Sequence, residues 1–248
     1  IAPTEVEERS GEYIAELIED GSTIQMGIGG VPYAVSKLLH SKRDLGVHTE
    51  MLTEAMLELY ESGVITNKRK TLYPEKFVCA FVFGTQKLYN FVNNNPSVFV
   101  MSGSFTNDPF ILGQNSKMVS INAALMIDLT GQVCSEAIGT RHYSGTGGQL
   151  DTHRGAVRSA LKGLGGKGII ALRSTAKKGE VSKIVPTLPQ GSPVTVPRQD
   201  LDYVVTEFGI AHLRGKTAAE RARAMIEISH PDHRKTLEEE ARKIGLLF

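Results

Sequence analysis

The sequence predicts an α/β protein with an open, mainly parallel sheet and helices on both faces. Three observations support this prediction. Segments with the helical spacing of apolar residues alternate with short apolar runs along the chain. Residues 77–83 are seven consecutive apolar residues, which is typical of a strand covered on both faces. Glycine and proline separate the segments, and no internal repeat is present.

The predicted elements follow one another in chain order. A capping box that starts at Thr4 opens the first helix, and Pro32 stands at the first position of the second helix. Residues 118–121, 124–128 and 132–134 are predicted to be short antiparallel excursions near the sheet edge. The predicted strands are residues 23–28, 45–50, 77–83, 98–101, 168–172 and 203–209, and the predicted helices are residues 5–20, 32–39, 53–60, 88–92, 152–161, 217–229 and 232–244.

Composition narrows the class of protein. The chain has 248 residues, 41% hydrophobic and 22% charged, as is ordinary for a globular protein. A net charge of +1 argues against a nucleic-acid partner. Apolar runs stay shorter than the roughly 20 residues of a membrane helix, and there is no signal-peptide pattern. Cys79 and Cys134 have no metal-ligand spacing, so we expect free buried thiols in a cytoplasmic protein without a metal.

Glu50 is the first candidate functional residue, because it stands where the strand 45–50 is predicted to end. In open α/β sheets, ligands bind in the crevice outside the carboxyl ends of the strands. A solvated glutamate at the entrance of a loop is the alternative. Other motifs at the same edge favour the functional interpretation.

Two glycine clusters are expected near Glu50. Gly27-Ile28-Gly29-Gly30 joins a strand to a helix, where backbone N–H groups can meet a phosphate or a developing oxyanion. The second cluster contains Gly145, Gly147 and Gly148, and it lets a ligand approach the backbone closely. A structural turn and a flexible loop are the respective alternatives.

A basic segment follows the strand 168–172. Residues 174–184 carry Lys177, Lys178 and Lys183 among hydroxyl side chains, a composition suited to phosphate contact. A plain surface hairpin explains the same composition equally well.

Four motifs occur in a fixed order along the chain. They are Gly27-Ile28-Gly29-Gly30-Val31-Pro32, His48-Thr49-Glu50-Met51, the segment from Ser144 to Asp151, and the segment from Val205 to Lys216. In this order and spacing they resemble the acetyl-CoA hydrolase/transferase family, and within it the 4-hydroxybutyrate and butyrate CoA-transferases. The resemblance runs from about Val6 to Ile244. Close members carry serine where this chain has Thr49, a change that keeps the hydroxyl.

The resemblance implies an architecture and partners. It implies the CoA-transferase (NagB-like) fold, with residues 1–248 as the carboxyl-terminal one of two similar α/β domains and an amino-terminal domain that is missing here. A start at Ile1 agrees with this expectation. The implied partners are an acyl-CoA and small carboxylic acids, and the implied assembly is a homodimer without membrane or nucleic-acid contacts.

The resemblance also implies roles for individual residues. Glu50 would be the nucleophile that carries CoA as a thioester, so that coenzyme A is the group transferred and neither a metal nor a redox cofactor is needed. Backbone N–H groups from Ile28 to Gly30 and at Gly147 and Gly148 would stabilise the oxyanions. Asn107 matches a polar active-site asparagine of the family. Gly27, Ile28, Gly30 and Gly145 would line the CoA site, with Lys177, Lys183, Arg214 and Lys216 as contacts for its phosphates.

Three other side chains are considered as functional residues. Glu136 lies in a turn, and Glu207 ends a strand before a glycine as Glu50 does, so the residues alone leave Glu207 as a second candidate acid. His48 adjoins the nucleophile, but strand alternation sends it to the opposite face from Thr49, and we interpret it as structural.

Three functions stay open at this point. The first is a CoA-transferase that works through a glutamyl-CoA thioester. The second is an acyl-CoA hydrolase on the same scaffold, in which water replaces the acceptor acid. The third is a CoA-binding domain that is inactive without its partner domain.

Overall fold

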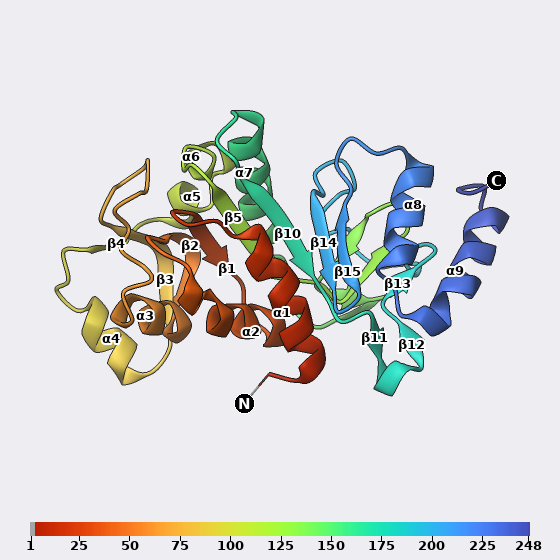
Figure 1. Ribbon diagram of the computed structural model, residues 1–248, viewed down its shortest axis with the longest axis horizontal. Helices are drawn as coiled ribbons and strands as arrows, with labels where there is room; N and C mark the ends of the chain where they lie inside the picture. Colours follow the sequence, from red (N-terminus) through yellow and green to blue (C-terminus); the bar gives the residue numbers. More distant parts are fainter. Residues whose placement is uncertain (1–2) are drawn as a thin grey trace.

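An eight-stranded sheet forms the centre of the protein in a computed structural model that describes residues 3–248, with Ile1 and Ala2 outside the described residues (Figure 1). All neighbouring strands are parallel except the last pair, β14 and β15, which confirms the predicted α/β class. In spatial order the strands are β15 (Gly209–His212), β14 (Tyr203–Thr206), β10 (Lys167–Ala171), β5 (Met118–Ala123), β1 (Thr23–Met26), β2 (Gly46–Thr53), β3 (Phe77–Phe83) and β4 (Val98–Val100).

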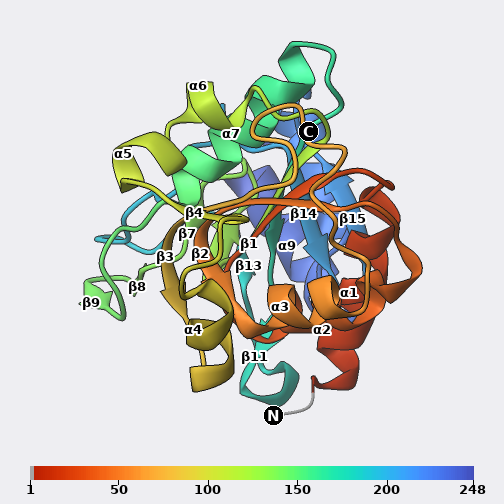
Figure 2. The same ribbon diagram turned by 90° about the vertical axis from the view of Figure 1, so that its left-hand side faces the viewer.

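Helices cover both faces of this sheet, as predicted. Figure 2 shows α5, α6 and α7 on one face and α1, α2 and α3 on the other. The α-helices are α1 (Glu5–Leu17), α2 (Gly30–Leu38), α3 (Glu54–Glu61), α4 (Gln86–Val92), α5 (Gly103–Thr106), α6 (Pro109–Leu112), α7 (Gln149–Leu161), α8 (Ala218–Glu227) and α9 (Pro231–Lys243). Two short 3-10 helices are η1 (Leu39–Ser41) and η2 (Lys177–Gly179).

Three small sheets lie beside the main one. The parallel pair of β6 (Met126–Asp128) and β13 (Ile184–Val185) is extended by β7 (Val133–Cys134), and two hairpins are β8 (Ala137–Ile138) with β9 (Arg141–His142) and β11 (Thr175–Ala176) with β12 (Val181–Ser182). The antiparallel pairing of β6 with β7 agrees with the sequence prediction, but these strands form a sheet of their own.

Apolar burial holds the layers together in two main clusters. One cluster includes Ile14 of α1, Val35 of α2 and Leu57 of α3, packed against β1 and β2. The other joins β14 and β15 to α8 and α9 through side chains such as Met225 and Leu237. Burying each such side chain stabilises the fold by about 1.5–3 kcal/mol. Within residues 3–248, no helix is both long enough and apolar enough to cross a membrane.

The direction of the chain reverses at β1. From β1 the chain moves outward through β2, β3 and β4, and it then crosses back to place β5 on the other side of β1. Crevices for ligands form where the strand order reverses, outside the carboxyl ends of the strands. The site is therefore expected above β1 and β5.

The sheet also opens between β1 and β2. Their pairing covers only Gly46 and Val47 of β2, whereas β1 stays paired with β5 as far as Ile121. Strand β2 instead continues along β3 to Thr53. Glu50 and Met51, in the part of β2 beyond its pairing with β1, therefore border the crevice.

Four sequence predictions need correction. Glu50 lies inside β2 and not at its end, because β3 supports the strand as far as Thr53. Residues 118–121 were predicted to be an antiparallel segment near the sheet edge, but they belong to the central parallel strand β5. The polar residues of this strand made it look exposed, although β1 and β10 bury it. Pro32 is the third residue of α2, since the helix begins at Gly30. The antiparallel strand β15 was not predicted.

Candidate active site

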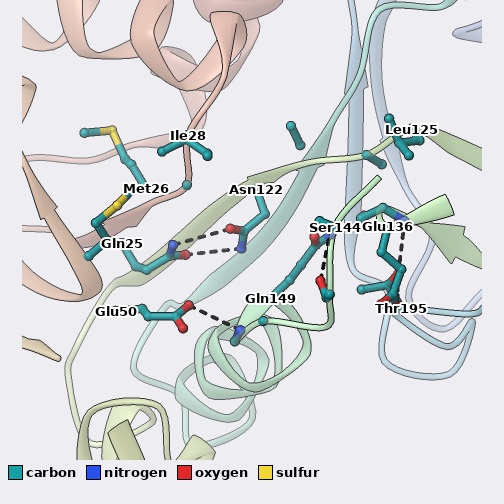
Figure 3. A pocket seen from close by; sticks show the side chains of 18 of the residues that line it. Gln25, Met26, Ile28, Glu50, Asn122, Leu125, Glu136, Ser144, Gln149 and Thr195 are labelled. Atoms are coloured by element: carbon teal, nitrogen blue, oxygen red, sulfur yellow. Dashed lines mark hydrogen bonds between the residues drawn. The ribbon is translucent and has the colours of Figure 1, made fainter. Parts of the chain in front are cut away.

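A pocket of about 440 Å³ opens at the carboxyl ends of the central strands (Figure 3). It is built from the ends of β1 and β5, from β2, and from the loop that precedes α7. The lining residues are Gln25, Met26, Gly27, Ile28, Glu50, Met51, Phe81, Asn122, Ala123, Ala124, Leu125, Ser135, Glu136, Ser144, Gly145, Gly147, Gly148, Gln149 and Thr195.

Glu50 reaches from β2 to the amino-terminal end of α7. Its Oε2 accepts a hydrogen bond of 3.2 Å from the backbone N–H of Gly148, the residue that caps this 13-residue helix (Figure 3). The amino-terminal end of a helix carries a partial positive charge, and its unpaired N–H groups favour an anion. The half-buried carboxylate is therefore held in one orientation at the edge of the pocket.

Gly148 allows this contact because it has no side chain. A Cβ at this position would collide with Nδ2 of Asn107 and would lie 2.6 Å from Oε2 of Glu50. The fold therefore brings Glu50, Asn107 and Gly148 together at one point. Asn107 follows Glu50 by 57 residues in the chain, and Gly148 follows it by 98 residues. Within residues 3–248, the buried Oδ1 of Asn107 has no hydrogen-bond partner.

The first glycine turn contributes less than predicted. Gly27 and Ile28 line the pocket, and Ile28 is 70% exposed. Gly29 has a φ of 126°, a conformation that favours glycine, but it lines a neighbouring apolar pocket. Gly30 lies against the carboxylate of Glu7, which also pairs with Arg173 at 2.6 Å. The start of α2 therefore faces a carboxylate of α1 and not Glu50.

A buried polar network, which sequence reasoning missed, fixes the floor of the pocket. Oε1 of Gln25 accepts hydrogen bonds from Oγ of Ser120 at 2.7 Å and from Nδ2 of Asn122 at 3.2 Å. Nδ2 of Asn122 also donates to Oγ1 of Thr152 in α7 at 3.2 Å. The network ties β1 and β5 to the helix whose end meets Glu50. Alternate polar residues in a central strand, Ser120 and Asn122, were the available indication.

The two rival acids are separated by the structure. Glu136 lines the same pocket as Glu50, on the opposite wall (Figure 3). Glu207 lines a second pocket, and both of its carboxylate oxygens accept hydrogen bonds from Ser174, at 2.6 Å and 2.9 Å. Of the two, Glu136 is therefore the acid that shares the pocket.

His48 is buried below the site. Its Nε2 lies 2.9 Å from the carbonyl oxygen of Thr106, and its Nδ1 lies 3.2 Å from Nδ2 of Asn115. Burial, together with the nearby charge of Lys70, lowers the pKa of His48 to about 4. This environment supports the structural role expected for His48.

The four predicted phosphate contacts do not form one cluster. Nζ of Lys183 donates to the carbonyl oxygen of Ala124 at 3.2 Å, beside the pocket, and burial lowers the pKa of this lysine. Lys177 lines the second pocket with Glu207. Arg214 and Lys216 follow β15, whose last residue is paired with the first residue of β14, so they lie at the opposite edge of the sheet. Only Lys183 is close to the wall of the Glu50 pocket.

Metal-binding residues are not gathered anywhere in the described chain. Within residues 3–248, no group of three or more His, Cys, Asp or Glu side chains is arranged to hold a metal ion. Cys79 and Cys134 are free and buried. Burial raises the pKa of the Cys79 thiol to about 11.

Solved structures with the same architecture define the class of protein. RipA from Yersinia pestis superimposes with a TM-score of 0.93 at 43% identity, over 100% of this chain and 55% of that one. A 4-hydroxybutyrate CoA-transferase from Porphyromonas gingivalis gives a TM-score of 0.84 at 45% identity, over 98% of this chain and 57% of that one. The fold is that of the CoA-transferases.

The family follows from the sequence comparisons. Residues 84–241 match the model of the acetyl-CoA hydrolase/transferase C-terminal domain. A 4-hydroxybutyrate coenzyme A transferase from Clostridium kluyveri is 52% identical over 96% of this chain and 55% of its own length. The chain belongs to the acetyl-CoA hydrolase/transferase family, and it spans about half the length of the curated relatives it matches.

Proposed function

We propose that this domain carries the nucleophile of an acyl-CoA:carboxylate CoA-transferase, and that Glu50 is this nucleophile. One observation carries the proposal: the carboxylate of Glu50 lies in a pocket at the carboxyl edge of the sheet and accepts a hydrogen bond from the amide of Gly148. A carboxylate so oriented can react with a thioester without any other cofactor.

The reaction proceeds in two half-reactions. A carboxylate oxygen of Glu50 attacks the thioester carbonyl of an acyl-CoA, the carbon–sulfur bond breaks, and an acyl-glutamyl anhydride and CoA thiolate result. The thiolate then attacks the glutamyl carbonyl, which releases the free carboxylic acid and leaves CoA bound to Glu50 as a thioester. An acceptor carboxylate reverses both steps and leaves as the new acyl-CoA.

Gly148 serves the step that takes place on Glu50 itself. When the thiolate adds to the glutamyl carbonyl, negative charge develops on the oxygen that the Gly148 amide already contacts. The aligned amide and the helix end stabilise this charge, and losing such a donor costs about 3 kcal/mol in comparable sites. Nδ2 of Asn107 lies on the same side of Gly148 as this oxygen, since both atoms would crowd a Cβ at Gly148. Amides near Ile28 are the candidates for the oxyanion on the substrate side.

The pocket supports a small organic acid as the substrate. Met26, Ile28, Met51 and Phe81 provide an apolar wall, and Asn122 and Gln149 provide a polar one. An apolar wall favours the alkyl chain of butyrate, and a polar one favours a hydroxylated chain such as 4-hydroxybutyrate. We propose these acids, with acetate as the second acid, and Lys183 as the nearest candidate contact for a CoA phosphate.

The proposal is tested in the full-length protein with butyryl-CoA alone. We expect a CoA-sized mass adduct on the peptide that contains Glu50, and we expect its loss in Glu50→Gln together with at least a thousandfold drop in transfer, since the nucleophile is then absent. Glu58→Gln, which removes an exposed ion pair with Lys37, is the matched control. Full transfer activity in Glu50→Gln would refute the assignment.

Hydrolysis is the second candidate, because the matching family model covers both hydrolases and transferases. If water accepts the acyl group, CoA release will not depend on added acetate or butyrate. If a carboxylate accepts CoA, a new acyl-CoA will form only with the added acid. A domain that binds CoA without reacting would give neither the adduct nor a product.

The remaining expectations belong to the whole protein. A two-domain arrangement, a homodimer and a cytoplasmic location stay predictions. The free buried cysteines are compatible with a reducing compartment.

A further inference from the structure

The loop that delivers Gly148 to Glu50 has little packing of its own. Residues 143–147 are exposed, and a Cβ at Gly145 or Gly147 would meet nothing within 4 Å. Apolar contacts therefore do not fix this segment. Its position depends on hydrogen bonds.

Glu136 provides those hydrogen bonds from one buried position. Its carbonyl oxygen accepts from the N–H groups of Tyr143, at 2.7 Å, and Ser144, at 3.3 Å. Its Oε2 accepts from Oγ1 of Thr146 at 2.7 Å, two residues before Gly148. The side chain thus holds the loop near the end that carries the catalytic amide.

The other carboxylate oxygen of Glu136 is anchored in the buried framework. Oε1 accepts from Oγ1 of Thr195 at 3.0 Å, and this hydroxyl accepts in turn from the N–H of Ser135 at 3.0 Å. The N–H of Thr195 donates to the carbonyl of Val133 at 2.7 Å. Glu136 and Thr195 are each 7% exposed. A buried carboxylate needs such donors, because removing it from water is costly unless its oxygens are hydrogen-bonded.

We propose that Glu136 is a positioning residue, whose carboxylate links the Val133–Thr195 framework to the loop 143–148 and so holds the Gly148 amide against Glu50. The proposal rests on the proposed function of Glu50. Glu136 forms no bond with the substrate in this role. It acts through the loop, and a displacement of about 1 Å is enough to slow a reaction strongly.

The test uses the full-length protein and three variants. Thr146→Val removes only the loop side of the link, at an exposed residue, and Glu136→Ala removes the link itself. The double variant combines them. Thr140→Val is the matched control: this exposed threonine lies in the turn of the β8–β9 hairpin, which precedes the loop, and its hydroxyl makes no hydrogen bond within residues 3–248.

We expect kcat to fall on the order of tenfold in Thr146→Val and Glu136→Ala, less than the hundredfold or more expected when the donor itself is lost. KM for butyryl-CoA should change less than about threefold, because the link acts on the reacting geometry. The double variant should be no slower than Glu136→Ala, since both substitutions break one link. Additive losses, or Thr146→Val turning over as fast as Thr140→Val, would overturn the proposal.

Amide hydrogen exchange of the peptide 143–148 gives a readout independent of activity. We expect roughly tenfold faster exchange in Thr146→Val than in Thr140→Val. Unchanged exchange would contradict the link even if no adduct forms on Glu50. An adduct on wild-type Glu50 combined with unchanged exchange and turnover in Thr146→Val would leave the proposed function standing and refute this inference alone.

Discussion

At Gly148 the absence of one methyl group decides whether the site can form. The carboxylate of Glu50 and the amide of Asn107 occupy the space that a Cβ would need. The helix end is accessible to an anion only because the capping residue is a glycine. The sequence showed two glycine clusters but could not rank them, because Glu7 faces the first one only in the folded protein.

A first prediction concerns this glycine. Gly148→Ala should lower kcat by about a hundredfold, because the new Cβ displaces Glu50 from the amide that we propose stabilises its oxyanion. Gly103→Ala is the control, since a Cβ there meets nothing within 4 Å and φ is not positive. Steady-state transfer assays on both variants check this. Equal activities would show that the contact between Glu50 and Gly148 does not matter for turnover.

A second prediction concerns pH and His48. Its pKa is lowered from 6.5 to about 4, so the unfolded chain binds the proton more tightly than the folded one. Its contribution to stability is complete above pH 6.5 and is lost as the pH falls toward 4, by up to about 3 kcal/mol. His153, whose pKa burial also lowers to about 4, adds a similar dependence.

Urea unfolding at pH 7 and pH 5 measures this effect. His48→Gln should lose less stability between the two pH values than the wild-type protein does, and the remaining loss should reflect His153 and Lys70, whose pKa burial lowers to about 7. His40→Gln, at an exposed position, should retain the wild-type difference. An identical pH dependence in His48→Gln and the wild type would contradict the assigned pKa.

Among the elements, α7 depends most on its neighbours. Its 13 residues carry few large apolar side chains, and its buried residues include Thr152, Gly155 and Ser159. The polar network of Gln25, Ser120, Asn122 and Thr152 therefore ties the first turn of the helix to β1 and β5. A helical pattern predicted the existence of α7. Only the tertiary structure reveals that hydrogen bonds from β5 to Thr152 attach the helix to the sheet.

A third prediction tests the network. Asn122→Ala removes partners of Gln25 and Thr152 in a buried position, which should lower the free energy of unfolding by about 1–3 kcal/mol. It should also reduce turnover, because the end of α7 loses a tether. Thermal melts and transfer assays measure the two effects. Asn90→Ala removes only an exposed hydrogen bond with Gln86 and should change stability by less than about 0.5 kcal/mol.

In the whole molecule, the divergence of β1 and β2 creates the pocket at the carboxyl ends of the strands, and ion pairs connect the strands at their amino-terminal ends. Glu19 precedes β1 and pairs with Lys117, before β5, at 2.8 Å and with Lys167, in β10, at 2.9 Å. These hydrogen-bonded ammonium groups lower the pKa of Glu19 to about 2. These ion pairs join the amino-terminal ends of β1, β5 and β10, on the side of the sheet opposite the candidate active site.

A fourth prediction follows for Glu19→Gln. Its side chain is 49% exposed, so the loss of stability should be below about 1 kcal/mol at pH 7 and should shrink in high salt. The contribution is present above the unfolded pKa near 4.5 and is lost as the pH falls through about 2. Melting temperatures of both proteins from pH 7 to pH 3 should therefore converge toward the acid end. A constant difference would rule out the charge pairing.

The sequence by itself determined the α/β class, most helices and strands, the family, and Glu50 as the candidate nucleophile. The class and the elements follow from apolar periodicity and turn residues, whereas the family and the ranking of Glu50 above Glu207 follow from the resemblance that the ordered motifs carry. All of these signals are local in the chain. Long-range pairing is not, and the tertiary structure alone decided that β5 is central, that β1 and β2 diverge beside Glu50, and that β15 carries Arg214 and Lys216 to the far edge. It also decided that Glu136, and not Glu207, shares the pocket. The physical reason is that strand neighbours and buried polar partners are chosen by packing between segments tens of residues apart, which no local pattern encodes.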